Sequence, residues 1–240
     1  KKRMKFFVAK VNLKEFSKQG FESLRPLMIA YEASKFMLPI RLGMINGQGE
    51  QDLIVYLLSP QGQTELTNYR TVKIPSNVNI PEFVEKEFND FYKSMFTQTY
   101  QKENRNIGVL EYAWDMRSCD PCSSSPLTPD ELKKAGVFWD TSNVFITRLH
   151  VRYTRNKFPQ DLQFQNTANR RNFQGRYVIR RPYRGDIECK ASENYQRSVR
   201  NRQEQEAQTL ASLTGWKIDK IRSKIDFMEV KELPWWRRIF

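Results

Sequence analysis

The segment Val144-Phe-Ile-Thr-Arg-Leu-His-Val-Arg-Tyr153 alternates between apolar and polar side chains, most strictly towards its end. One side holds Leu149, Val151 and Tyr153, and the other holds Arg148, His150 and Arg152. Successive side chains of a β-strand point to opposite faces of the sheet. The segment therefore predicts a strand with one buried face and one basic, solvated face.

Further strands are expected on both sides of this segment, in runs rich in branched and aromatic residues. They are Phe6–Leu13, Leu24–Glu32, Met37–Ile45, Asp52–Leu58, Tyr69–Ile74, Ile107–Trp114 and Gly175–Arg181. The block Met37–Ile74 resembles an antiparallel meander. The near-continuous apolar run Asp52–Leu58 indicates a strand covered on both faces. The polar stretch Gln160–Asn172 is expected to be a loop.

Helical spacing replaces alternation in three places. Ile80–Thr99 places an aromatic stripe along one side, typical of core packing, and Asn79 is positioned to cap it. Thr128-Pro-Asp-Glu131 is a capping box that opens a short helix through Ala135. At the C-terminal end, Ser192–Thr214 predicts a helix that ends at Gly215, and Ile218, Ile221 and Ile225 mark another.

These elements predict an α+β fold, with a mostly antiparallel sheet, a long amphipathic helix packed on it, and a helical C-terminal extension. We expect residues 1–189 to form a mixed α+β domain and residues 190–226 to extend it with helices. Residues 227–240 would form an aromatic and basic tail.

Composition excludes several classes of protein. Of the 240 residues, 39% are hydrophobic and 13% are aromatic, which is too rich in apolar residues for a disordered chain. The longest apolar run, Leu53–Leu58, is far shorter than the ~20 residues of a membrane span. Neither a phosphate-binding glycine loop nor a His-Glu-x-x-His motif is present, so no cofactor is expected.

The formal net charge is +13, and much of it lies between Arg148 and Arg202, where 14 Lys/Arg face 4 Asp/Glu. Such a field attracts anionic partners. We expect a protein partner or an anionic membrane surface, and no nucleic acid, because no nucleic-acid-binding motif accompanies the charge. The residues predicted to bind the partner or an anion are Arg148, Arg152, Arg176, Arg180, Trp235, Trp236, Arg237 and Arg238.

Two other arginines, Arg41 and Arg70, are expected to pair with acids such as Asp52 or Asp115. The single histidine, His150, lies between two arginines on its strand. We expect it to be a surface or packing residue rather than a base beside a carboxylate.

Cys119-Asp-Pro-Cys122 leaves three interpretations open. The two cysteines form a structural disulfide in an oxidising compartment, or they form the redox-active dithiol of a thiol–disulfide oxidoreductase. The serine-rich sequence that follows breaks the helix such a dithiol requires. In the third interpretation Cys119, Cys122, His150 and Cys189 hold a zinc ion.

Ten ordered motifs between Phe6 and Trp216 resemble the bacterial domain-of-unknown-function family 2330. They are Phe36–Met44, Gln51–Leu53, Asn68–Thr71, Glu111–Met116, Cys119–Cys122, Gly136–Trp139, Leu149–Tyr153, Phe158–Leu162, Phe173–Tyr177 and Leu210–Trp216.

This family has no established activity, so the resemblance implies location rather than mechanism. Its members look like exported proteins with a further N-terminal half. The resemblance therefore implies that a sequence starting at Lys1 is the C-terminal portion of a longer precursor. We expect a periplasmic or otherwise extracytoplasmic, non-enzymatic binding or assembly subunit of the cell envelope. Its partner would be another protein or its own upstream half.

Overall fold

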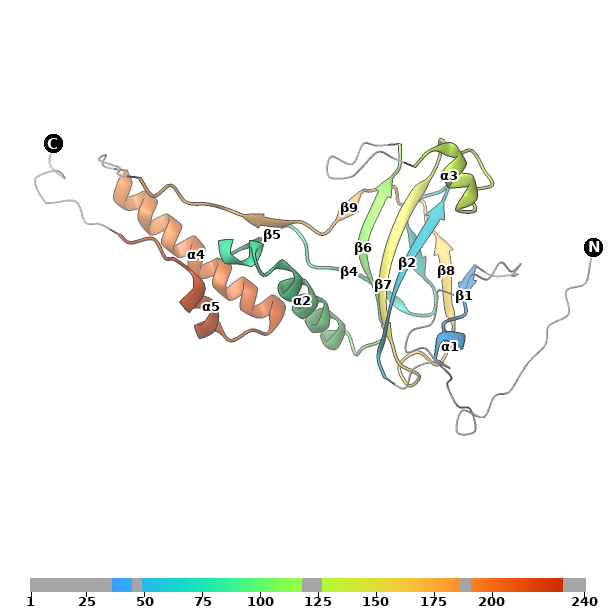
Figure 1. Ribbon diagram of the computed structural model, residues 1–240, viewed down its shortest axis with the longest axis horizontal. Coiled ribbons are helices and arrows are strands. Elements are labelled where there is room, and N and C mark those ends of the chain that lie inside the picture. Colours follow the sequence, from blue (N-terminus) through green and yellow to red (C-terminus); the bar gives the residue numbers. More distant parts are fainter. Residues whose placement is uncertain (1–35, 45–48, 118–126, 186–190, 231–240) are drawn as a thin grey trace, which may run out of the picture.

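The computed structural model describes residues 36–44, 49–117, 127–185 and 191–230. Figure 1 shows an elongated arrangement, with most of the strands at one end and helices α4 and α5 at the other. Helix α2, Phe88–Lys102, lies between the two ends. The predicted strands Phe6–Leu13 and Leu24–Glu32 lie outside the described residues.

The main sheet has the strand order β2-β7-β6-β4, with a short strand β9 also paired to β6. The bounds are Gln51–Ser59 for β2, Arg70–Lys73 for β4, Ile107–Asp115 for β6, Phe145–Tyr153 for β7 and Phe173–Gln174 for β9. β2 and β6 run antiparallel to β7, and β4 runs parallel to β6. The prediction of an antiparallel meander over Met37–Ile74 is wrong. In the sheet, β7 and β6 lie between β2 and β4, although both come later in the sequence.

A second, smaller sheet covers one face of the first, with the order β1-β8-β3. Its strands are Met37–Leu38, Thr64–Leu66 and Leu162–Asn166, numbered β1, β3 and β8. The expected loop at Gln160–Asn172 is therefore partly a strand, in which Leu162 and Phe164 supply buried side chains. These pack with inward-facing residues of the main sheet, such as Val55, Leu149 and Val151, in one core cluster.

The strand expected over Met37–Ile45 ends early. After β1 the chain passes Pro39 and turns into a short helix α1, Ile40–Gly43. Proline cannot donate to a β ladder, which accounts for a strand that stops before it. The backbone N–H of Arg41 donates to Asp161 Oδ1 over 2.9 Å.

The helix expected over Ile80–Thr99 is in fact two elements. A 3-10 turn, Glu82–Glu85, precedes α2, and its N-cap residue is Pro81, with no side-chain cap. The aromatic stripe does pack into a core, since Phe91, Met95, Phe96 and Tyr100 are all buried. They join Ala207 and Leu210 of the C-terminal helix in a second core cluster.

The other helices confirm the sequence prediction. α3, Pro129–Lys134, has the capping box of Thr128 and Glu131. α4, Ser192–Thr214, ends at Gly215, whose φ of 72° is a left-handed conformation favoured by glycine. α5, Ile218–Lys224, buries Ile221.

A two-stranded parallel pair lies beside these helices. It joins β5, Val78–Ile80, to β10, Tyr177–Ile179. The fold class is α+β, with mostly antiparallel pairing, as the sequence predicts. Among the helices of the described residues, none is long and apolar enough to cross a membrane.

Candidate functional site

A polar cluster on the main sheet lies at a β-bulge in β6. Up to Leu110, residues of β6 pair regularly with β7, but Tyr112 then faces Arg148 where regular spacing would place Glu111. Glu111 is therefore an inserted residue. Regular alternation from Val109, which pairs with His150, already places Glu111 on the face of the sheet that carries Arg148 and His150. The extra residue moves Tyr112 to that face as well and returns Ala113 to the core. We call the face that carries Arg148 and His150, opposite the β1-β8-β3 layer, the outer face.

Three polar side chains contact the Glu111 carboxylate, whose side chain is only 5% exposed. Arg148 Nε lies 2.9 Å from Oε2, and His150 Nδ1 lies 3.0 Å from Oε1. The Tyr92 hydroxyl, from α2, also donates to Oε1. A buried carboxylate needs such partners, because burial of an unpaired charge is strongly unfavourable.

These contacts set the protonation states of the cluster. Burial raises the pKa of Glu111, but the hydrogen bonds with His150 and Tyr92 and the nearby charge of Arg148 outweigh this effect, so the pKa falls below its usual 4.5. Burial and the neighbouring Glu111 raise the pKa of Tyr92 well above its usual value of 10. At neutral pH Glu111 is thus an ionised acceptor and Tyr92 a protonated donor.

His150 and Arg152 extend the cluster along the outer face to Asp52. His150 Nε2 lies 3.0 Å from Asp52 Oδ1. Arg152 donates two hydrogen bonds to the same carboxylate, from Nε over 2.8 Å and from Nη2 over 3.1 Å. The imidazole also stacks on Phe96 of α2, with ring centroids 3.8 Å apart. The sequence interpretation of His150 as a residue without a carboxylate partner is wrong, because two carboxylates flank it.

The prediction that one face of β7 is basic and solvated is likewise wrong. Arg148, His150 and Arg152 are half-buried, and α2 covers part of them. Their carboxylate partners come from β6 and β2. Arg70 does pair with an acid, but its partner is Glu103, 2.6 Å away, and not Asp52 or Asp115.

A cleft of about 580 Å³ opens beside Glu111, where the start of α2 leaves the outer face uncovered. Tyr56 of β2 and Phe88 of α2 stand at its rim with 59% and 43% exposure. Arg148 lies 5.7 Å above the Tyr56 ring, close enough for a cation–π contact. The remaining lining residues are Ile74, Asn89, Tyr92, Lys93, Glu111, Tyr112, Ile146, Gln174, Gly175 and Tyr177.

The cleft also presents polar groups that the chain itself leaves available. Within the described ranges, the side chains of Asn89, Lys93 and Gln174 have no hydrogen-bond or ion-pair partner. A pocket that combines aromatic surface with a few polar groups is typical of a binding site. The Glu111 carboxylate, by contrast, is already in contact with Arg148, His150 and Tyr92, and it positions Arg148 and Tyr92.

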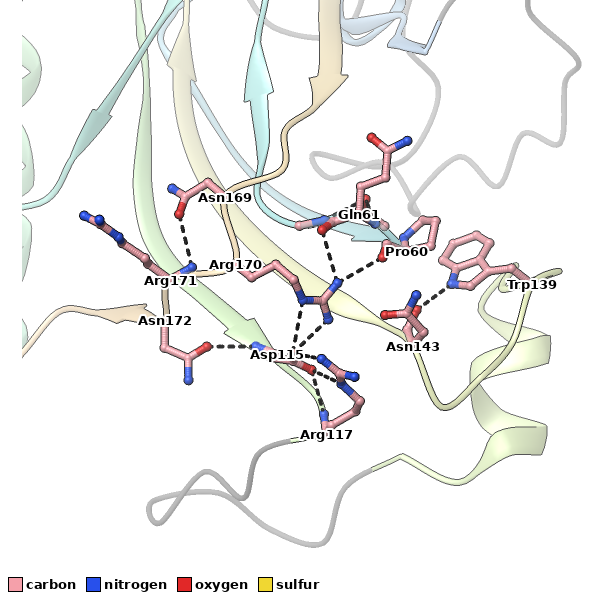
Figure 2. Close-up of polar contacts among 12 residues, drawn as sticks. Pro60, Gln61, Asp115, Arg117, Trp139, Asn143, Asn169, Arg170, Arg171 and Asn172 are labelled. Carbon is pink, nitrogen blue, oxygen red and sulfur yellow. Dashed lines mark hydrogen bonds and ion pairs between the residues drawn. The ribbon is translucent and has the colours of Figure 1, made fainter.

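A second polar cluster, drawn in Figure 2, anchors the end of β6. The Asp115 carboxylate accepts from Arg117 Nη2 at 2.7 Å and from Arg170 Nη2 at 2.8 Å. Arg170 Nη1 also donates to the carbonyl oxygens of Pro60 and Gln61, in the turn after β2. The hydrogen bond from Arg117, together with those from Arg170, lowers the pKa of Asp115 well below its usual 3.8. This cluster fixes the chain just before the segment that holds Cys119 and Cys122.

Several predicted site residues lie outside the described residues. They are Cys119, Cys122, Cys189, Trp235, Trp236, Arg237 and Arg238. The disulfide, the redox dithiol and the zinc site therefore stay predictions. For the zinc site, both ring nitrogens of the predicted ligand His150 already lie 3.0 Å from carboxylate oxygens.

Arg176 and Arg180 are exposed, but they flank β10, which pairs with β5 and not with the main sheet. They therefore do not form one sheet face with Arg148 and Arg152. Arg180 Nε donates to Asn79 Oδ1 over 3.2 Å. A partner-binding role for Arg176 and Arg180 stays a prediction.

Sequence reasoning missed Tyr92, Glu111 and the cleft. The sequence of residues 107–115 alternates without a visible change of phase, so it gave no signal for the bulge. In the structure Leu110 and Ala113, three residues apart, both lie in the core, which a regular strand does not allow.

Comparison with known proteins assigns a family but no activity. Residues 1–165 match the family described as "Uncharacterized protein conserved in bacteria (DUF2330)". The match extends into β8, so two of the ten motifs, Phe173–Tyr177 and Leu210–Trp216, lie beyond it. A search of the curated proteins and a search of the solved structures each found no match. The chain belongs to this uncharacterized bacterial family.

Proposed function

We propose that this protein is an exported, non-enzymatic binding subunit of the bacterial cell envelope, and that the cleft beside Glu111 docks an acidic segment of a protein partner. The observation that carries the proposal is the uncovered part of the outer face. There Tyr56 and Phe88 are exposed around a cleft whose central carboxylate is already ion-paired with Arg148 and hydrogen-bonded by Tyr92. Exposed aromatic side chains around a concave site are typical of protein-recognition surfaces.

Charge complementarity favours an acidic partner. The chain carries a net charge of +13. Within the cleft, Lys93 has no partner in the described part of the chain, and Arg148 is 39% exposed at its side chain. A partner carboxylate that contacts Lys93 would gain an ion pair without displacing an existing one. The amides of Asn89 and Gln174 can hydrogen-bond to the main chain of a bound segment.

Site-specific photo-cross-linking in the native envelope tests the proposal. Phe88, at the rim of the cleft, is replaced by the photoreactive analogue p-benzoylphenylalanine. The matched control carries the same replacement at Phe138, which is 93% exposed and lies just after α3. We expect a discrete protein adduct from position 88 and none of the same mass from position 138.

The identity and charge of the cross-linked segment then show whether the partner is an acidic protein segment. The cross-linked segment should have a net negative charge, and a synthetic peptide of that segment should compete with adduct formation. Charge reversal by Lys93→Glu should reduce the adduct yield at position 88 by about tenfold, the effect of ~1.4 kcal/mol. Adducts only to lipid, only within the same chain, or equally from position 138 would contradict the proposal.

A further inference from the structure

The strand β2 forms one end of the main sheet. All nine of its residues pair with β7, from Gln51 opposite Tyr153 to Ser59 opposite Phe145, without a shift in register. Over the described ranges, no strand pairs with its other edge. In a regular antiparallel ladder, alternate residues direct their N–H and C=O groups away from the existing neighbour. β2 therefore presents a straight row of backbone groups along that edge.

Natural proteins protect such edges with proline, lysine, bulges or short strands. β2 has none of these devices. The sequence Gln51-Asp-Leu-Ile-Val-Tyr-Leu-Leu-Ser59 contains no proline, lysine or arginine, and nine residues exceed the usual strand length of about five or six. Ile54 and Tyr56 add apolar side chains with 38% and 59% exposure on the outer face. These features are typical of an edge that pairs with another strand.

We propose that this edge pairs antiparallel with β2 of a second copy of the chain, about a two-fold axis at Val55. This register is the one in which all nine residues overlap and both outer faces lie on the same side. It places Ile54 opposite Tyr56 of the second copy, and Tyr56 opposite Ile54 of the second copy. Pairs of an aromatic and a β-branched side chain are among the favourable cross-strand pairs.

The buried side of the same strand is equally self-complementary. Val55 faces Val55 of the second copy, and Leu53 faces Leu57 of the second copy. The one charged residue, Asp52, is already held by Arg152 and falls opposite Leu58 of the second copy, so no like charges meet. The result is one sheet continuous across two chains. This inference does not depend on the occupant of the cleft.

Analytical ultracentrifugation of the whole chain gives the first test. The wild-type protein should show a concentration-dependent monomer–dimer equilibrium. Ile54→Lys should raise the dimer dissociation constant by about tenfold or more, because it places two ammonium groups in the joined sheet. The control Val178→Lys, at a position with 39% exposure on β10, should leave the equilibrium unchanged.

Disulfide trapping tests the register. Under mild oxidation, a mixture of the Ile54→Cys and Tyr56→Cys variants should give a covalent dimer, because these positions lie directly opposite each other. Each variant alone should give no more dimer than wild type, because its own cysteines are then diagonal neighbours about 7–8 Å apart. A monomer at all concentrations, an unchanged equilibrium in Ile54→Lys, or equal trapping by the single variants would overturn the proposal.

Discussion

Replacing Glu111 by glutamine tests whether the bulge cluster holds α2 on the sheet. The change keeps the size of the side chain but removes its charge. Arg148 and His150 then face an amide in which only the carbonyl oxygen can accept a hydrogen bond. The NH₂ group takes the place of the second carboxylate oxygen and cannot accept from either residue. Breaking a buried ion pair costs about 3–5 kcal/mol. Because the Arg148 side chain is 39% exposed and regains water, we expect a loss of about 2–4 kcal/mol in the free energy of unfolding.

Urea unfolding followed by circular dichroism measures this loss. With a slope of about 2 kcal/mol per molar urea, the midpoint of Glu111→Gln should fall by about 1–2 M. The matched control Glu103→Gln breaks the exposed pair with Arg70, whose side chain is 73% exposed, and should lose about 0–1 kcal/mol. A midpoint for Glu111→Gln no lower than that of Glu103→Gln would refute the reasoning.

The same variant has a defined pH dependence. The pKa of Glu111 in the folded protein lies below its ordinary value of 4.5. Its stabilising contribution is therefore complete above about pH 4.5 and is lost as the pH falls through the lower, folded-state pKa. The difference in stability between wild type and Glu111→Gln should accordingly shrink in acid.

Three other substitutions have expected effects on the urea midpoint. Asp115→Asn should destabilise the protein at pH 7. The difference in stability from wild type should shrink below about pH 4, because the folded-state pKa of Asp115 is depressed and its stabilising contribution is lost in acid. A difference that stays constant with pH would argue against this. Thr128→Ala removes the capping box of α3 and should cost about 1 kcal/mol, whereas Thr128→Ser should cost little. Gly62→Ala should cost about 1–3 kcal/mol, because a Cβ there would lie 2.5 Å from the carbonyl oxygen of Asn169, and a wild-type midpoint would contradict this packing.

Local sequence patterns predicted several of the longer elements. The alternation that ends at Tyr153 located β7, and the capping box located α3. Pairing between distant segments was beyond such patterns. β8 lies in a polar stretch, and its strand conformation depends on hydrogen bonds to β1 and β3, more than 90 residues earlier in the chain.

The candidate site was harder to predict for the same reason. The basic residues of β7 were identified, but their partners were not, because Asp52 comes from β2 and Glu111 from a bulge in β6. Charge counts treat each side chain as solvated. In the folded chain α2 covers part of this face, and the charges of Arg148 and Arg152 are balanced by carboxylates. The cleft arises only from the position of α2 over the sheet.

Oxidative footprinting of Phe88 tests the central claim, that the cleft beside Glu111 is occupied by a partner, most directly. Hydroxyl radicals modify exposed aromatic rings, and Phe88 is 43% exposed in the free chain. We predict that Phe88 is modified readily in the purified protein and is protected in the native envelope, whereas Phe138 is modified in both. Equal modification of Phe88 in the two preparations would contradict the account.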